Sequence, residues 1–169
     1  VELIENTEFE TINNISSIHA ARKVMGTADC FICEADLYIS DLSIFDAELS
    51  RSCYYGKMVP GFSDDWVFDW DGERITRVGK EGTDRYNMVG VSYFKKADAA
   101  VIRDAIDAAY EKPGYEGLYW DEIVDRQLDK LNLDIHPVEK EQIVEIDSVA
   151  ELAVIDESYR EVLEKMQAE

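Results

Sequence analysis

The chain has 169 residues, 46% of them hydrophobic, which suffices for one packed core and predicts a single domain over residues 1–169. Its 37 acidic residues against 17 basic ones give a formal net charge of −20, which disfavours binding to nucleic acid or to an anionic membrane surface. Because neither a run of about 20 apolar residues nor a basic segment followed by an apolar one occurs, we expect no membrane span and no signal peptide. The odd count of three cysteines fits a reducing compartment, so we expect a cytoplasmic protein.

Apolar residues recur with strand or helix spacing along the whole chain. In chain order, the spacing predicts a strand ending at 3–4, a helix over 15–25, strands over 30–33, 52–59, 66–70, 74–78 and 88–94, helices over 97–110 and 120–131, strands over 133–138 and 142–146, and a last helix from 149. Asp71-Gly72 is typical of a hairpin turn, and Ser148 with Glu151 matches a capping box. This order predicts an α/β fold with a mixed sheet flanked by helices.

Carboxylates follow two of the predicted strands. Glu34 and Asp36 come after the strand over 30–33, and Glu145 and Asp147 end the strand over 142–146. Residues two apart in a strand share a face, and sheets of this kind bind ligands at the carboxyl ends of their strands. Such pairs could hold Mg²⁺, which prefers carboxylates and substrate phosphates. The alternative is chance, because the chain has 37 acidic residues.

Aromatic side chains stand next to acids at two places. Trp66 follows Asp65, and Tyr119-Trp120 precedes Asp121. A quaternary ammonium cannot donate an N–H hydrogen bond, so proteins hold it with aromatic ring faces, often beside a carboxylate. Ordinary packing in the core or at its rim is the alternative, since 11% of the chain is aromatic.

The sequence gives little support for redox, zinc, phosphate-loop or hydrolase chemistry. Cys30 and Cys33 form a C-x-x-C pair, but both fall inside a run that reads as a buried strand, with the two thiols on opposite faces. No second pair completes a zinc site. The sequence also lacks a glycine-rich phosphate loop and the G-x-S-x-G element of hydrolases.

Six short segments carry a resemblance to a known family. They are Asn13-Asn14 with Ser16-Ser17, Glu34-Ala35-Asp36, Asp65-Trp66, 89–94, 118–121 and 145–148. In this order they resemble the bacterial CTP:phosphocholine cytidylyltransferases, which have the nucleotide-diphospho-sugar transferase fold (GT-A or Rossmann-like). The resemblance covers nearly all of this chain but only the C-terminal portion of such an enzyme. Its most specific elements are Tyr-Trp-Asp and Glu-Ile-Asp-Ser.

The resemblance implies a reaction and a metal. Asp36 and Asp147 would be the catalytic aspartates that bind Mg²⁺, and Glu145 would orient the metal or the choline. The partners would be CTP and phosphocholine, and the products CDP-choline and pyrophosphate. An oxygen of phosphocholine would attack the α-phosphorus, and positioning and electrostatics would supply most of the catalysis.

The resemblance also implies the acceptor site. Trp66 and Trp120, helped by Tyr119 and Asp121, would form the wall that binds the cation. One departure lies at Ile15-Ser16-Ser17, where relatives often carry aromatic residues, and it weakens any choline contact there.

A larger departure is that the family's N-terminal glycine-rich segment, which recognises the nucleotide, is not in this chain. The chain also opens within a strand-like run and without Met. We therefore expect a portion that is incomplete and inactive alone, with a homo-oligomer left open. Two other functions stay open. One is a sugar-1-phosphate nucleotidyltransferase, and the other is a non-catalytic binding or oligomerisation module with the same fold.

Overall fold

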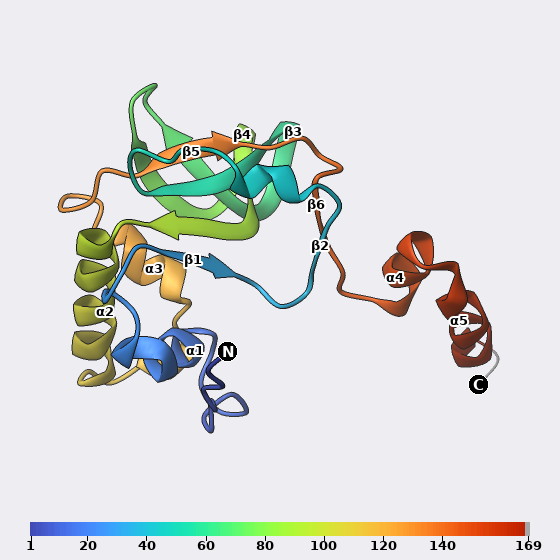
Figure 1. Ribbon diagram of the computed structural model, residues 1–169, viewed down its shortest axis with the longest axis horizontal. Helices are drawn as coiled ribbons and strands as arrows, with labels where there is room; N and C mark the ends of the chain where they lie inside the picture. The colour runs from blue at the N-terminus through green and yellow to red at the C-terminus, as the bar shows by residue number, and fades with distance from the viewer. Residues whose placement is uncertain (168–169) are drawn as a thin grey trace.

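A computed structural model describes residues 1–167. Its centre is a mixed four-stranded sheet in the order β1-β4-β3-β5, made of β1 (Cys30–Cys33), β4 (Ile75–Phe94), β3 (Cys53–Trp70) and β5 (Asp134–Pro137). β1 and β3 run antiparallel to β4, whereas β5 runs parallel to β3. The predicted mixed sheet flanked by helices is therefore confirmed, and Figure 1 shows the helices below the sheet and to one side of it.

The two long strands β3 and β4 form one curled hairpin. Asp71 starts its turn by accepting hydrogen bonds from the backbone N–H groups of Glu73 and Arg74, both at 2.9 Å. Gly72 has a φ of 100°, a conformation that glycine adopts without steric cost. Register shifts between Val59 and Phe62 and between Ser63 and Trp66 bend the pair. As a result, the far end of the hairpin curls back over the sheet (Figure 1).

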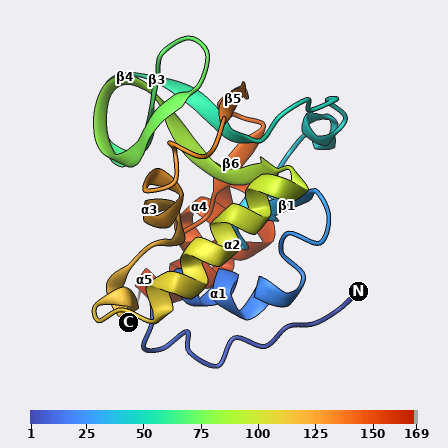
Figure 2. The same cartoon turned by 90° about the vertical axis from the view of Figure 1, so that its left-hand side faces the viewer.

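Helix α2 (Lys96–Tyr110) covers one face of the sheet, as the view in Figure 2 shows. Its apolar residues recur every three or four positions, and they are buried because that spacing places them on one side of the helix. Helix α1 (Ile15–Ala20), the 3-10 helix η1 (Ala21–Lys23), the 3-10 helix η3 (Tyr115–Gly117) and helix α3 (Trp120–Asp125) lie next to α2 or follow it in the chain. Fully buried side chains of this core include Tyr54, Phe68, Phe94, Ile102, Ile106 and Leu133.

A second, two-stranded sheet lies beside the first. Strand β2 (Leu37–Ile39) pairs antiparallel with β6 (Ile143–Glu145), so Leu37 lies opposite Glu145. The 3-10 helix η2 (Leu42–Phe45) follows β2, and a smaller apolar cluster packs around Tyr55 and Ile143. This pairing matters for function because it joins the segment after β1 to a strand more than a hundred residues later.

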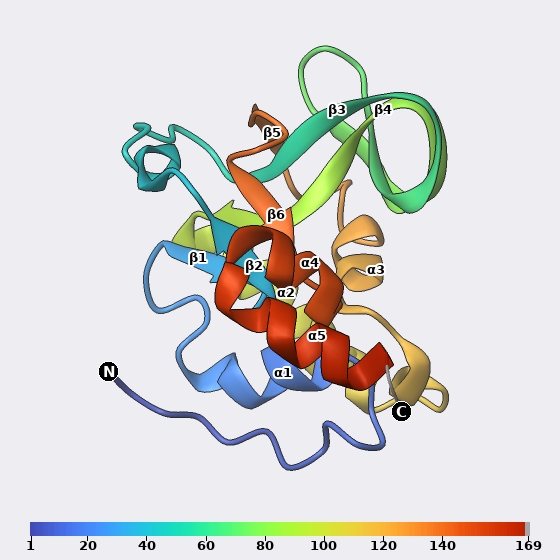
Figure 3. The same ribbon diagram turned by 90° about the vertical axis from the view of Figure 1, so that its right-hand side faces the viewer.

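The chain then leaves the body through β6. Helix α4 (Val149–Ile155), the 3-10 helix η4 (Glu157–Tyr159) and helix α5 (Arg160–Gln167) pack on one another to one side of the sheets (Figures 1 and 3). The predicted cap of α4 is confirmed, since the Ser148 hydroxyl accepts a hydrogen bond from the Glu151 N–H at 3.2 Å. Within the described residues, no helix is both long and apolar enough to cross a membrane.

Several predicted boundaries were wrong. Residues 1–6 form no strand, and the helix predicted over 15–25 becomes α-helical only to Ala20 before tightening into η1. The helix predicted over 120–131 ends at Asp125 and continues as turns. The strand over 30–33 was expected to be buried, but β1 is an edge strand with β4 on one side only, so Cys33 is exposed.

Candidate functional site

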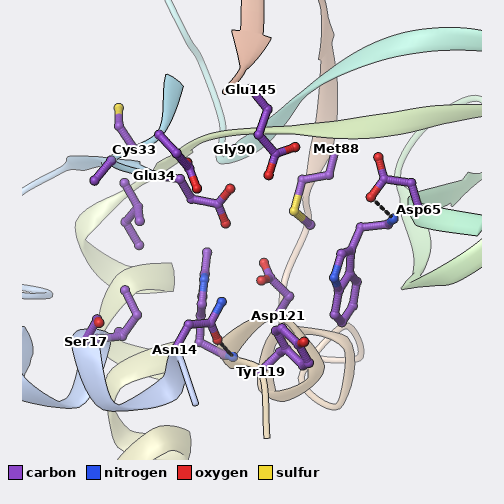
Figure 4. Close-up of a pocket in the computed structure, with 16 residues that line it drawn as sticks. Asn14, Ser17, Cys33, Glu34, Asp65, Met88, Gly90, Tyr119, Asp121 and Glu145 are labelled. Carbon is purple, nitrogen blue, oxygen red and sulfur yellow. Dashed lines mark hydrogen bonds between the residues drawn. The ribbon is translucent and has the colours of Figure 1, made fainter. Parts of the chain in front are cut away.

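A cavity of about 450 Å³ opens where the ends of the strands meet α1 and α3 (Figure 4). Its walls come from segments far apart in the sequence, namely the residues after β1, the curled part of β3, the middle of β4, the start of α3 and the end of β6. The lining residues include Asn14, Ser17, Glu34, Asp36, Asp65, Trp66, Gly90, Tyr119, Trp120, Asp121 and Glu145. Five of them are carboxylates. Among the residues that the structure describes, no lysine or arginine lines this cavity.

Three of the acids form a cluster that could hold a metal ion. Carboxylate oxygens of Glu34, Asp36 and Glu145 all lie within 4.8 Å of one another. The backbone brings them together, because the N–H of Ile146 donates to the carbonyl of Asp36 at 2.8 Å in continuation of the β2–β6 pairing. Hard oxygen ligands in this arrangement suit Mg²⁺ or Mn²⁺.

The cluster is electrostatically unfavourable when it holds no cation. Burial raises the pKa of Glu34, and the nearby Asp36 and Asp65 raise it further. Burial likewise raises the pKa of Glu145, with contributions from Asp147, Asp36, Glu34 and Asp65. Repulsion between like charges has this effect because it disfavours the ionised form of each group. A bound cation would relieve the repulsion.

Gly90 leaves the room that this cluster needs. Its φ of 74° lies in the left-handed region, and its carbonyl accepts a hydrogen bond from the Glu34 N–H at 2.9 Å. A Cβ atom at this position would approach the Glu34 Oε2 atom to 2.7 Å. A side chain at position 90 would therefore strain the backbone and displace the carboxylate.

Asp121 is the most deeply buried acid of the cavity, with 2% of its surface exposed. It lies in the first turn of α3, and its Oδ1 atom accepts a hydrogen bond from the Tyr54 hydroxyl at 2.9 Å. Desolvation raises its pKa to about 7, helped by Glu34 and Glu122, while the Tyr54 hydrogen bond acts in the opposite direction. Asp121 therefore exchanges its proton near neutral pH.

The aromatic residues of the predicted cation wall have different positions. Trp66 and Tyr119 are half-buried and meet edge to face, with ring centroids 5.3 Å apart. Trp120 also lines the cavity, but only 5% of its surface is exposed, and it packs against Tyr54 and Phe94 at 6.0 and 6.1 Å between centroids. The accessible aromatic surface is therefore that of Trp66 and Tyr119, because Trp120 serves mainly as core.

The predicted residue Asp147 lies near the acidic cluster but does not line the cavity. Its backbone N–H donates to Glu151 at 3.0 Å, next to the start of α4. The structure thus brings together Asp36, Glu145 and Asp121 from the predicted set, with Trp66, Tyr119 and Trp120 in the same lining. Figure 4 shows Glu145, Asp121 and Tyr119 around this cavity. Asp147 as a metal ligand stays a prediction.

Sequence reasoning gave no role to two polar residues of the cavity. The Asn14 Oδ1 atom accepts a hydrogen bond from the Trp120 N–H at 3.0 Å, and the Asn14 side chain lines the cavity (Figure 4). Ser17, one turn later on α1, adds a hydroxyl. The sequence feature that could have indicated them is the pair Asn13-Asn14 followed by Ser16-Ser17. Such residues at the start of a helix are as typical of helix capping as of ligand binding.

The chain has clear relatives of known activity. No protein-family model matches it. It is 51% identical over 160 residues to the 2-aminoethylphosphonate cytidylyltransferase of Lancefieldella rimae, a match that spans 94% of this chain and 65% of that protein. It is 25% identical over 158 residues to the choline-phosphate cytidylyltransferase of Streptococcus pneumoniae, over 93% of this chain and 68% of the relative.

The fold agrees with these relatives. The structure matches that of CTP:phosphocholine cytidylyltransferase from Streptococcus pneumoniae with a TM-score of 0.79 and 23% identity, covering 95% of this chain and 69% of that one. The chain therefore has the nucleotidyltransferase fold, of the nucleotide-diphospho-sugar transferase type. Within that class, its sequence relates it to the cytidylyltransferases.

Proposed function

We propose that this chain forms the acceptor-binding part of a cytidylyltransferase whose acceptor is 2-aminoethylphosphonate. In the proposed reaction, a phosphonate oxygen forms a bond to the α-phosphorus of CTP. The bond between that phosphorus and the oxygen bridging to the β-phosphate breaks, and pyrophosphate leaves. The named activity of the relative from Lancefieldella rimae supports this choice of acceptor.

The observation that carries the proposal is the acidic cavity. Its lining includes five carboxylates and, within the described residues, no basic side chain, so it favours a ligand or ion with positive charge. The primary ammonium of 2-aminoethylphosphonate donates N–H hydrogen bonds, which carboxylates accept strongly. Asp121 would hold this ammonium against Trp66 and Tyr119, and Ser17 adds a polar hydroxyl to the same wall.

A divalent cation would complete the site. The residues present fit Mg²⁺, because Glu34, Asp36 and Glu145 offer carboxylate oxygens within 4.8 Å of one another. We propose that these three hold it, with Asp147 contributing negative charge nearby. Bound there, Mg²⁺ would offset the negative charge of the triphosphate and of the reacting oxygens. The chain's own residues would then fix the direction of attack by holding the acceptor at its ammonium end.

Phosphocholine is the second candidate acceptor. The Trp66 and Tyr119 rings favour it, because ring faces can bind a quaternary ammonium that donates no hydrogen bond. The relative from Streptococcus pneumoniae is named for activity on choline phosphate, but it is only 25% identical to this chain, against 51% for the relative from Lancefieldella rimae. A hexose phosphate fits less well, since its uncharged sugar would leave the buried Asp121 without a cationic partner.

The test measures the rate at which the full-length protein releases pyrophosphate from CTP in the presence of Mg²⁺ and one acceptor at a time. The acceptors are 2-aminoethylphosphonate, phosphocholine and glucose 1-phosphate. We expect the highest kcat/KM with 2-aminoethylphosphonate and a large loss in Asp121→Asn. Asp46→Asn, an exposed acid away from the cavity, is the matched control. Turnover of glucose 1-phosphate alone, or of no acceptor, would overturn the proposal.

A further inference from the structure

A second cavity lies behind the aromatic pair. It has a volume of about 420 Å³ and is lined by Lys80, Glu122, Asp125 and Arg126, among others. Its lining shares two residues with the acceptor cavity, Trp66 and Tyr119. The two rings therefore form a partition, with the carboxylates of the acceptor cavity on one side and Lys80 on the other.

The ammonium of Lys80 lies over this partition. Its Nζ atom is 5.1 Å from the centroid of the Tyr119 ring and 5.8 Å from that of Trp66, both within the range of cation–π attraction. Within the described part of the chain, no ion pair of 4.0 Å or less involves Lys80. In a protein with 37 acidic residues, this lysine thus meets ring faces rather than a carboxylate.

The fold holds Lys80 in place from the backbone. Lys80 is the cross-strand partner of Trp66 in the β3–β4 pairing. The guanidinium of Arg77 donates hydrogen bonds to the carbonyls of Lys80 and Glu81, at 3.2 and 3.0 Å, and its Nε atom donates to Asp69 at 2.8 Å. Gly79 gives the guanidinium room, because a Cβ atom there would lie 2.6 Å from it.

The acids that share the second cavity are already engaged in the structure. The Oδ1 atom of Asp125 accepts a hydrogen bond from the Val78 N–H at 2.8 Å, and Glu122 accepts one from the Tyr119 N–H at 2.8 Å. Arg126 lies 3.9 Å from Glu122. These contacts hold both carboxylates at the backbone, and among the residues that the structure describes the cation recorded over the faces of the two rings is the Lys80 ammonium.

We propose that Lys80 is a specificity-determining residue of the acceptor site, which lowers the affinity for a quaternary ammonium relative to a primary one. A cation on one side of a ring repels a second cation on the other side. A quaternary ammonium depends on the rings and is weakened most, whereas a primary ammonium is also held by hydrogen bonds to carboxylates. This inference rests on the proposed function and adds the basis of its selectivity.

The test is the ratio of kcat/KM for 2-aminoethylphosphonate to that for phosphocholine, in the encoded protein with CTP and Mg²⁺. Lys80→Met removes the charge and keeps most of the stem, and it should shift the ratio toward phosphocholine by roughly two- to fivefold. Lys80→Arg should keep the wild-type ratio. Lys130→Met, which removes a surface charge far along the chain and outside both linings, should also leave it unchanged.

A purely structural role for Lys80 would lower both kcat/KM values together, so an unchanged ratio in Lys80→Met overturns the inference. Calorimetric titration of both acceptors gives the same ratio independently of turnover and should shift in the same direction. If the wild-type protein binds neither acceptor, the proposed function itself fails. If it binds 2-aminoethylphosphonate and only the shift is missing, the role of Lys80 alone fails.

Discussion

The hydroxyl of Tyr54 donates a 2.9 Å hydrogen bond to the buried carboxylate of Asp121, and this contact joins the hydrophobic core to the candidate acceptor site. Tyr54 is fully buried in β3, packed between Phe68, Phe94 and Trp120. A carboxylate at this depth is costly unless it is protonated or paired with a cation. An ammonium ligand would therefore stabilise the ionised form of Asp121.

Replacing Asp121 should change how stability depends on pH. Its pKa is about 7 in the folded protein and 3.8 as the ordinary reference, so between these values the folded state retains a proton that the unfolded state loses. The free energy of unfolding therefore falls as pH rises through this window. In Asp121→Asn the fall should be smaller by on the order of 3 kcal/mol between pH 4.5 and pH 8. Urea unfolding of both proteins measures this, and parallel pH profiles would contradict it.

The affinity for 2-aminoethylphosphonate should rise between pH 6 and pH 8. Asp121 loses its proton across this range, and an ammonium binds the carboxylate rather than the carboxylic acid. Calorimetric titration at several pH values measures the affinity. The same titration in Asp121→Asn reports any dependence that comes from the phosphonate itself. A wild-type profile no steeper than that of the variant would count against a role for Asp121.

Tyr54→Phe should move the pH profile of acceptor binding upward. The hydrogen bond from Tyr54 lowers the pKa of Asp121, so its loss raises that pKa and shifts the rise in affinity to higher pH. Tyr55→Phe is the matched control, because the Tyr55 hydroxyl donates to the Ile44 carbonyl at 2.9 Å, outside the acceptor cavity. Both variants should lose about 1 kcal/mol of stability. Only Tyr54→Phe should shift the profile, and an equal shift in both would refute the assignment.

Trp66→Ala should weaken acceptor binding by about two- to thirtyfold, with the larger loss for phosphocholine, because ring faces contribute more to a quaternary ammonium. Trp70→Ala removes an indole four residues along the same strand. Trp70 is 45% exposed and lines neither cavity, so affinity should hardly change. Calorimetry with both acceptors makes the comparison, and equal losses in the two variants would point to a general effect on the hairpin.

Asp36→Asn and Glu145→Gln should each weaken Mn²⁺ binding by at least about tenfold, because each removes a ligand and its charge. Electron paramagnetic resonance of free Mn²⁺ measures this without any turnover. Asp147→Asn should have a smaller effect, since Asp147 does not line the cavity, and the exposed Asp46→Asn should have none. A loss in Asp147→Asn as large as that in Asp36→Asn would instead make Asp147 a ligand.

The sequence predicted local features whose cause is local. The spacing of Ile102 and Ile106, the Asp71-Gly72 turn and the Ser148 cap each depend on neighbouring residues, and all three are present. The long strands β3 and β4 were predicted as separate pieces. The polar segment 61–65 resembles a loop, yet the cross-strand pairs Phe62–Thr83 and Ser63–Gly82 keep it within β3. Tertiary pairing overrides local propensity there.

In the candidate site, too, some features follow from the local sequence and others only from the tertiary fold. Glu34 and Asp36 were expected to share a face of a continuing strand, but β1 ends at Cys33 and the two acids lie in the turn that leads into β2. The approach of Glu145 depends on the β2–β6 pairing, which spans more than a hundred residues. Trp120 was expected in the cation wall, whereas packing against Tyr54 and Phe94 places most of its surface in the core. Lys80 carries no motif, and its position over Trp66 follows from a register that only the fold defines.

Recognition of the amino end of the acceptor is tested most directly by comparing 2-aminoethylphosphonate with ethylphosphonate, which lacks the amine and keeps the phosphonate. Both are titrated calorimetrically into the encoded protein in the presence of Mg²⁺. We expect 2-aminoethylphosphonate to bind at least about tenfold more tightly, because hydrogen bonds between charged groups contribute roughly 1.5–3 kcal/mol. Equal affinities for the two ligands would mean that the carboxylates and aromatic rings of this cavity do not bind the ammonium group.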